Sequence, residues 1–287
     1  MTAPEGPSRL DGVQRATTRV LAELDRVCER LGIRYAVYGG TAIGAVRHRG
    51  FIPWDDDADV CLPRADYERL LDEAPALLGE AYVLVSPRHS EDYPQTFAVL
   101  GLKGSEFVSQ VAKDRPYRMP IGVDLFPLDP IPDDEAAYRR QSRSTWLWGR
   151  LLFLRGTPRA ATGLPGPLAP LAGGIMLAVH ATMRALRISP RRLQRAWERA
   201  ARRHEHSGST LLGDFSTRDP KHWAVRVDEL FPCARVPFED ITVMLPKEYD
   251  AILTRGYGDY MELPPADQRV NHEAHSVVYG PYWDEDR

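Results

Sequence analysis

The chain has 287 residues, of which 43% are hydrophobic and 27% are charged, and its formal net charge at pH 7 is −3. This is the composition of an ordinary enzyme with one large or two small domains, and the net negative charge excludes nucleic acid as a general electrostatic partner. The cysteines (Cys28, Cys61 and Cys233) lie far apart without a CxxC motif, so we expect neither a disulfide framework nor a zinc site. Residues 1–7 lack the basic and apolar segments of a secretory signal, which predicts a cytoplasmic protein.

Helices and strands alternate in the first half of the chain. Apolar residues at helical spacing predict an amphipathic helix over 9–31, and Gly32 ends it. A short strand over 35–38 runs into Gly39-Gly40. The remaining predicted elements are a helix over 41–48, a strand over 57–62, a helix over 63–78, and strands over 82–86, 97–103 and 121–128. We therefore expect an α/β core with a mixed sheet and flanking helices over residues 1–135.

The middle of the chain is basic. Between Arg139 and Arg203 there are 14 arginines, and Glu198 is the only acid. We expect a helical, arginine-rich insertion over 136–210. Its arginines are either solvated or in internal ion pairs, or they face a membrane surface, a polyanion or the acceptor, since basic residues alternate there with short apolar runs. The first interpretation is slightly favoured. Prolines and glycines interrupt the apolar stretch 165–183, so it is not expected to span a membrane.

The end of the chain returns to mixed structure. A turn and strand are predicted over 236–246 and a helix over 247–254. We expect residues 211–287 to complete the fold that begins in 1–135.

The most informative segment runs from Tyr38 to Val60. Asp55, Asp57 and Asp59 alternate there, and alternate residues of a strand share one face. Carboxylates crowded in this way favour a bound cation, and Mg²⁺ or Mn²⁺ prefers oxygen ligands. The preceding glycines, Gly39 and Gly40, stand where a strand leads into a helix, which is a favourable place for an anion. The segment therefore predicts a site for a metal ion and a phosphate.

Two other interpretations of the aspartates fit less well. A calcium EF-hand loop needs glycine at its sixth place and glutamate at its twelfth, where this chain has Val60 and Asp66. A sugar-nucleotide glycosyltransferase with a DxD motif needs a nucleotide-binding fold at the N-terminus, and the initial helix does not provide one.

Four segments resemble motifs of one family. They are Tyr38–Asp59, Gly122–Asp129, Phe238–Tyr249, and the stretch from Tyr257 to His272 that contains Arg269. Together, and in this order, they resemble the LicD family, which includes fukutin and fukutin-related protein. No motif of that family is visible between Arg139 and Arg203.

The resemblance implies a nucleotidyltransferase-like fold and a phosphotransferase activity. The enzyme would move a phospho-alcohol group, such as phosphocholine, ribitol phosphate or glycerol phosphate, from a CDP-activated donor to a hydroxyl of a cell-surface glycan or glycolipid. By the same resemblance, Asp57, Asp59 and Asp124 are the catalytic carboxylates and metal ligands. Asp124 either completes the metal shell or accepts the proton of the attacking hydroxyl.

Five further residues are expected to bind the donor. Gly39, Gly40 and Thr41 match the family segment that lines the donor phosphates. Arg47 stands between the glycines and the aspartates, and Lys103 closes a predicted strand, so each is a candidate phosphate contact. Asp55 is expected to assist as a metal ligand. For Arg269 and His272, a structural role is at least as well supported.

Two other functions remain open. A nucleotidyltransferase with the same fold would add NMP from an NTP to a small hydroxyl compound such as an antibiotic, and it would release pyrophosphate. An inactive accessory protein of envelope assembly would show no thermal shift with Mg²⁺ or CDP ligands. The presence of Asp57, Asp59 and Asp124 argues against the inactive protein.

Overall fold

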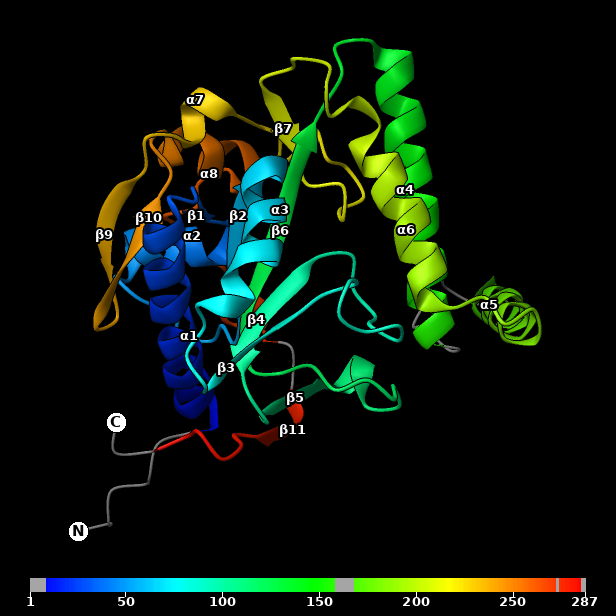
Figure 1. Cartoon of the computed structure of the whole chain (residues 1–287), viewed down its shortest axis with the longest axis horizontal. Helices are drawn as coiled ribbons and strands as arrows, with labels where there is room; N and C mark the ends of the chain where they lie inside the picture. The colour runs from blue at the N-terminus through cyan, green and yellow to red at the C-terminus, as the bar shows by residue number, and fades with distance from the viewer. Residues whose placement is uncertain (1–8, 158–167, 272–273, 285–287) are drawn as a thin grey trace.

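The computed structural model describes residues 9–157, 168–271 and 274–284 (Figure 1). The first half contains α1 (Arg9–Leu31), β1 (Ala36–Val37), α2 (Gly39–Arg47), β2 (Ala58–Pro63), α3 (Arg64–Glu73), β3 (Tyr82–Val85), β4 (Ala98–Leu102), β5 (Glu106–Ser109) and β6 (Gly122–Pro130). The second half contains α4 (Glu135–Gly156), α5 (Leu168–Ala185), α6 (Pro190–Ala201), β7 (Leu211–Gly213), β8 (Val225–Arg226), α7 (Val227–Leu230), β9 (Ala234–Phe238), β10 (Ile241–Leu245), α8 (Tyr249–Tyr257) and β11 (Ala274–Val278). Short 3-10 helices occupy 74–76, 110–112, 202–204 and 266–268.

The central sheet has the strand order β1-β2-β6-β4-β3, and β7 and β8 extend it from the end of β6. Strands β2 and β6 run parallel, whereas β1, β4, β3 and β7 pair with their neighbours antiparallel. The predicted mixed α/β fold is therefore confirmed.

Helices α1 and α3 cover one face of this sheet (Figure 1). Helix α1 has the predicted bounds, and its Leu21 and Leu24 are fully buried. They pack in one core with Val60 of β2 and Val123 of β6. Because side chains alternate along a strand, the neighbouring residues in β2 and β6 point to the opposite face.

The predicted middle region is helical in its described part. Helices α4 and α6 lie side by side, and α5 projects from them (Figure 1). The Gln141 amide of α4 donates a hydrogen bond of 2.7 Å to the carbonyl of Ala201 in α6. No single described helix is long and apolar enough to cross a membrane, and only the pair 169–185 and 190–204, bent by 107°, meets the criteria of length and composition together.

Some of the arginines in this region form ion pairs. Within the described residues, Arg139 pairs with Glu135 and Arg191 with Glu91. Arg202 pairs with three glutamates, at positions 68, 198 and 205. The other described arginines between 139 and 203 form no ion pair with a described carboxylate.

The C-terminal part returns to the core. Strand β7 pairs with the end of β6, and β11 pairs with β5. The segment 236–246, predicted as a turn followed by a strand, is instead part of a hairpin in which both β9 and β10 are strands. Strands β5 and β11 were not predicted, because neither has a regular alternation of buried and exposed residues.

Candidate active site

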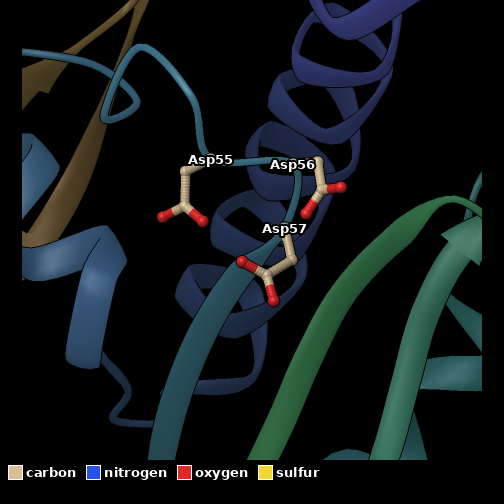
Figure 2. Close-up of side chains that lie close together, drawn as sticks. All are labelled: Asp55, Asp56 and Asp57. Carbon is tan, nitrogen blue, oxygen red and sulfur yellow. The ribbon is translucent and has the colours of Figure 1, made fainter. Parts of the chain in front are cut away.

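Three aspartates converge on the loop that leads into β2. Asp55, Asp56 and Asp57 each offer a carboxylate oxygen, and these oxygens lie within 4.8 Å of one another (Figure 2). Strand β2 begins at Ala58, so the prediction that Asp55 and Asp57 share a strand face was wrong. A loop turn brings them together instead: the Asp55 N–H donates to the carbonyl of Ile52 at 2.8 Å. From α1, the Gln14 amide donates to the carbonyl of Asp55 at 2.8 Å and fixes the loop.

Asp59 and Asp124 lie on the two parallel strands next to this loop. They are paired in register across β2 and β6 and lie on the sheet face away from α1. Burial raises the pKa of Asp59 well above its usual range, and the nearby carboxylates of Asp57 and Asp124 raise it further. The structure therefore gathers negative charge where the sequence predicted a cation.

The two glycines lie directly against these carboxylates. Gly39 and Gly40 are the first residues of α2. A Cβ atom added to Gly40 would lie 2.9 Å from Asp55 Oδ2, and one added to Gly39 would lie 3.6 Å from Asp59 Oδ2. Gly39 also has a φ of +53°, which favours glycine. The N-terminus of α2, a favourable place for an anion, thus faces the carboxylate cluster.

Thr41 connects α2 to β2. Its hydroxyl accepts a hydrogen bond of 2.8 Å from the backbone N–H of Asp59, and the side chain is buried. Its own N–H donates to the carbonyl of Tyr38 at 3.1 Å. These contacts position the Asp59 backbone.

Arg47 lies at the other end of α2, about 10 Å from the glycines at 1.5 Å per residue. Its guanidinium donates to the carbonyls of Tyr260 at 2.6 Å and Glu262 at 3.3 Å. Nearby, Arg269 lies over the Trp54 ring, with 5.2 Å from Cζ to the ring centroid. The contacts of Arg47 therefore hold the C-terminal segment to α2. His272, named beside Arg269 in the motif, lies outside the described residues.

Lys103 is not brought to the carboxylate cluster. It follows β4, whose Val99 pairs with Asp124, and four residues of extended chain place it about 13 Å further along. Its Nζ lies 6.0 Å from the centroid of the Tyr282 ring.

A cavity of about 210 Å³ opens beside the carboxylates. Its lining includes Asp56, Asp57 and Asp124, together with Arg115 and Tyr117 from the loop between β5 and β6. Asp56 was expected only to orient or flank the metal ligands, and no role was predicted for Arg115 and Tyr117. The loop that holds Arg115 and Tyr117 has no motif and no apolar period, so the sequence offered no signal for them.

Tyr257 of α8 also lies close to Gly39, and no role was predicted for it. Its hydroxyl would lie 3.3 Å from a Cβ atom at Gly39. Burial raises the pKa of this hydroxyl, and the negative charge of Asp59 raises it further. The sequence did contain an indication of Tyr257, because this residue belongs to the C-terminal segment that resembles the family motif.

The comparisons with known proteins agree with this site. Residues 32–134, which include Gly39, Gly40, the aspartate loop, Asp59 and Asp124, match the family described as LicD/FKTN/FKRP, nucleotidyltransferase domain. The resemblance to the LicD family is thus confirmed for this part of the chain. The matched region holds the parallel strands β2 and β6 and the start of α2.

One curated relative is the lipopolysaccharide cholinephosphotransferase LicD of Haemophilus influenzae. It is 32% identical over 121 residues, which are 42% of this chain and 44% of that protein. The matched part thus spans less than half the length of that relative.

Proposed function

We propose that this protein is a phosphotransferase that moves a phospho-alcohol group from a CDP-activated donor to a hydroxyl of a glycan or glycolipid. The observation that supports it best is the register of Asp59 with Asp124 beside the aspartate loop, facing the glycine N-terminus of α2. A relative named as a lipopolysaccharide cholinephosphotransferase supports the same class of reaction.

The carboxylates fit a divalent metal ion of the Mg²⁺ or Mn²⁺ type. Their donor atoms are all oxygen, and those of Asp55, Asp56 and Asp57 lie within 4.8 Å of one another. Burial raises the pKa of Asp59, and the neighbouring Asp57 and Asp124 carboxylates raise it further, which a bound cation would reverse. Asp57 and Asp59 would hold the ion, with Asp55 and Asp56 close by and Asp124 opposite Asp59 on β6. When bound, the ion would neutralise charge on the donor pyrophosphate and polarise its phosphorus.

The residues of the chain supply orientation and proton transfer. The N-terminus of α2, at Gly39 and Gly40, orients the donor phosphates through its backbone N–H groups. The acceptor oxygen attacks the phosphorus that carries the alcohol, the bond to the CMP oxygen breaks, and CMP leaves. The Asp124 carboxylate accepts the proton of the attacking hydroxyl.

The helical region would form the acceptor side. Helix α5 exposes apolar side chains, among them Leu171 and Ile175, and arginines stand around it. We propose that this region contacts the inner face of a membrane from the cytoplasm, because apolar side chains flanked by arginines bind anionic lipid surfaces.

A donor panel tests the activity. The protein is incubated with Mg²⁺, a glycolipid fraction, and CDP-choline, CDP-ribitol or CDP-glycerol in turn, and CMP release is measured. Release from one donor supports the proposal. Absence of CMP from every donor, with a Mg²⁺-bound protein of normal stability, would count against it.

The domain description of the matched family favours one alternative, the transfer of NMP from an NTP. The same panel, extended to the four NTPs with a pyrophosphate readout, separates the two. Pyrophosphate release without use of any CDP-alcohol would replace the first proposal with the second.

A further inference from the structure

A second cavity lies between the core and the helical region. It has a volume of about 220 Å³ and is lined by the loop before β4, the loop between β5 and β6, the end of α4, and α5. The side chains that matter are Asp92, Arg115, Tyr117, Arg155, His180 and Arg184.

This cavity shares a wall with the cavity beside the aspartates. Pro94, Arg115 and Tyr117 line both. A ligand group held in the second cavity therefore lies next to the space in front of Asp57 and Asp124. The shared wall comes from the core, and the rest of the second cavity comes largely from the arginine-rich helices.

The cationic groups of the second cavity are largely uncompensated. Arg115 is half-buried, its Nε donates to the Thr157 hydroxyl at 2.8 Å, and its Cζ lies 4.9 Å from the centroid of the Phe153 ring. The Nε of Arg155 donates to the carbonyl of Ile188 at 2.8 Å. Neither arginine forms an ion pair with a carboxylate of the described residues.

Two acids also line the cavity, but they do not neutralise it. Asp92 and Asp114 are exposed, and neither takes part in an ion pair within the part of the chain that the structure describes. Three guanidiniums therefore outnumber the two carboxylates. The His180 imidazole lies beside them, with its Nδ1 2.8 Å from the carbonyl of Leu154. A half-buried guanidinium without a carboxylate partner favours a planar or tetrahedral oxyanion.

We propose that this cavity binds a phosphate group of the acceptor and thereby holds the acceptor hydroxyl toward Asp57 and Asp124. The proposal rests on the proposed function, because only a transferase needs an acceptor subsite. Under this proposal, the acceptor is a glycan or glycolipid that already carries a phosphate group. Arg155 and Arg184 bind this phosphate from the helical side, and Arg115 binds it from the shared wall.

Phosphate binding is measured without any turnover. The full-length protein is prepared with isotope-labelled histidine, the His180 resonance is assigned by its loss in His180→Gln, and inorganic phosphate is titrated at constant ionic strength. We expect a saturable shift of His180 that weakens about tenfold for each arginine removed, in Arg184→Gln and then in Arg155→Gln/Arg184→Gln. The matched control is Arg195→Gln/Arg199→Gln, which removes two exposed arginines from α6.

Equal titrations in the double variant and its control, or a shift that never saturates, would overturn the site. Because Arg184 is exposed, its single variant tests the site even if loss of the Arg155 contact to Ile188 disturbs folding. A soluble sugar phosphate that competes with inorganic phosphate identifies a soluble acceptor, and competition only by vesicles containing phosphatidic acid identifies a lipid headgroup. Competition by neither overturns the acceptor assignment.

Failure of this site and failure of the proposed function are distinguishable. CMP release from a CDP donor with no phosphate titration of His180 would remove the subsite and keep the transferase. Phosphate binding in a protein that uses no CDP donor would keep the anion site and remove its role in transfer.

Discussion

The two ends of the parallel strands β2 and β6 differ in their charged side chains: like charges meet at one end and opposite charges pair at the other. At the starting end, Asp59 and Asp124 stand opposite each other beside the aspartate loop. Burial raises the pKa of Asp59, and the carboxylates of Asp57 and Asp124 raise it further. At the far end, the guanidinium of Arg64, which follows β2, donates to both oxygens of Asp129 in β6, at 2.8 and 2.6 Å. Both members of this second pair are buried.

The difference separates charges that are paired within the fold from charges that the proposed metal ion would neutralise. A buried bidentate pair is complete within the chain and needs nothing from solution. Like charges held together by a loop, a strand register and a helix N-terminus repel one another, and the proposed cation would relieve this repulsion. Substitutions at the two ends should therefore have opposite effects on stability and activity.

The largest effect is expected at the starting end. Asp57→Asn and Asp59→Asn should each lower CMP release by at least about a thousandfold, because they remove metal-binding charge. Without divalent metal, neither variant should be less stable than the parent, because the repulsion is relieved. Thermal unfolding with and without Mg²⁺ checks this, since Mg²⁺ should stabilise the parent more than the variants. Asp72→Asn, an exposed acid on α3, is the control, and undiminished turnover in both site variants would contradict the metal assignment.

At the far end, a substitution should lower stability and leave the activity unchanged. Arg64→Met should lower the free energy of unfolding by about 3–5 kcal/mol, because it leaves Asp129 buried and unpaired. Urea unfolding measures this, and CMP release per folded molecule should stay at the parental level. Arg69→Ala, which breaks an exposed pair with Glu73, should change stability by less than about 1 kcal/mol. Similar losses in the two variants would show that the Arg64–Asp129 pair has no special role.

The bounds of the helices and strands near β2 and β6 were predicted better from the sequence than the contacts between their side chains. The bounds of α1 were predicted because its apolar residues recur over six turns with a clear glycine stop, and β2 was predicted to within one residue. The pairing of Asp59 with Asp124 joins residues 65 positions apart; local spacing could not predict it, and the family resemblance did.

The errors have physical causes as well. The aspartates were expected to converge through strand alternation, but the loop turn at Ile52 and Asp55 brings them together. Lys103, a predicted donor contact at the end of a strand, lies away from the carboxylates because β4 runs antiparallel to β6 and carries it past Asp124; its contact with the donor stays a prediction. Arg115 enters the cavity through a loop without periodicity, and only the folded chain shows it.

A third prediction concerns Asp214, an acid near the far end that pairs with no arginine or lysine among the described residues. Asp214 follows Gly213, which pairs with Asp129, and burial raises its pKa from 3.8 to about 6. The folded state therefore holds a proton that the unfolded state releases first, so stability falls as pH rises from about 4 to about 6. The loss is on the order of 2 kcal/mol. Asp214→Asn should remove it, and urea unfolding across this range should show the two curves diverging; parallel curves would contradict the assignment.

The smallest effect is expected from a change in the position of the carboxylates at the starting end. In Gly40→Ala, the new methyl group would lie 2.9 Å from Asp55 Oδ2, so the carboxylate must move by a few tenths of an ångström or more. The helix itself should gain stability, because alanine is the better helix former by about 1 kcal/mol. CMP release should nevertheless fall by about tenfold, because displaced catalytic groups lose rate steeply with distance. Gly173→Ala on α5, where a Cβ atom meets nothing within 4 Å, is the control for the helix effect and should leave the rate unchanged. A Gly40→Ala protein that is more stable and fully active would show that the carboxylates tolerate movement, and the contrast between the two strand ends would then rest on charge alone.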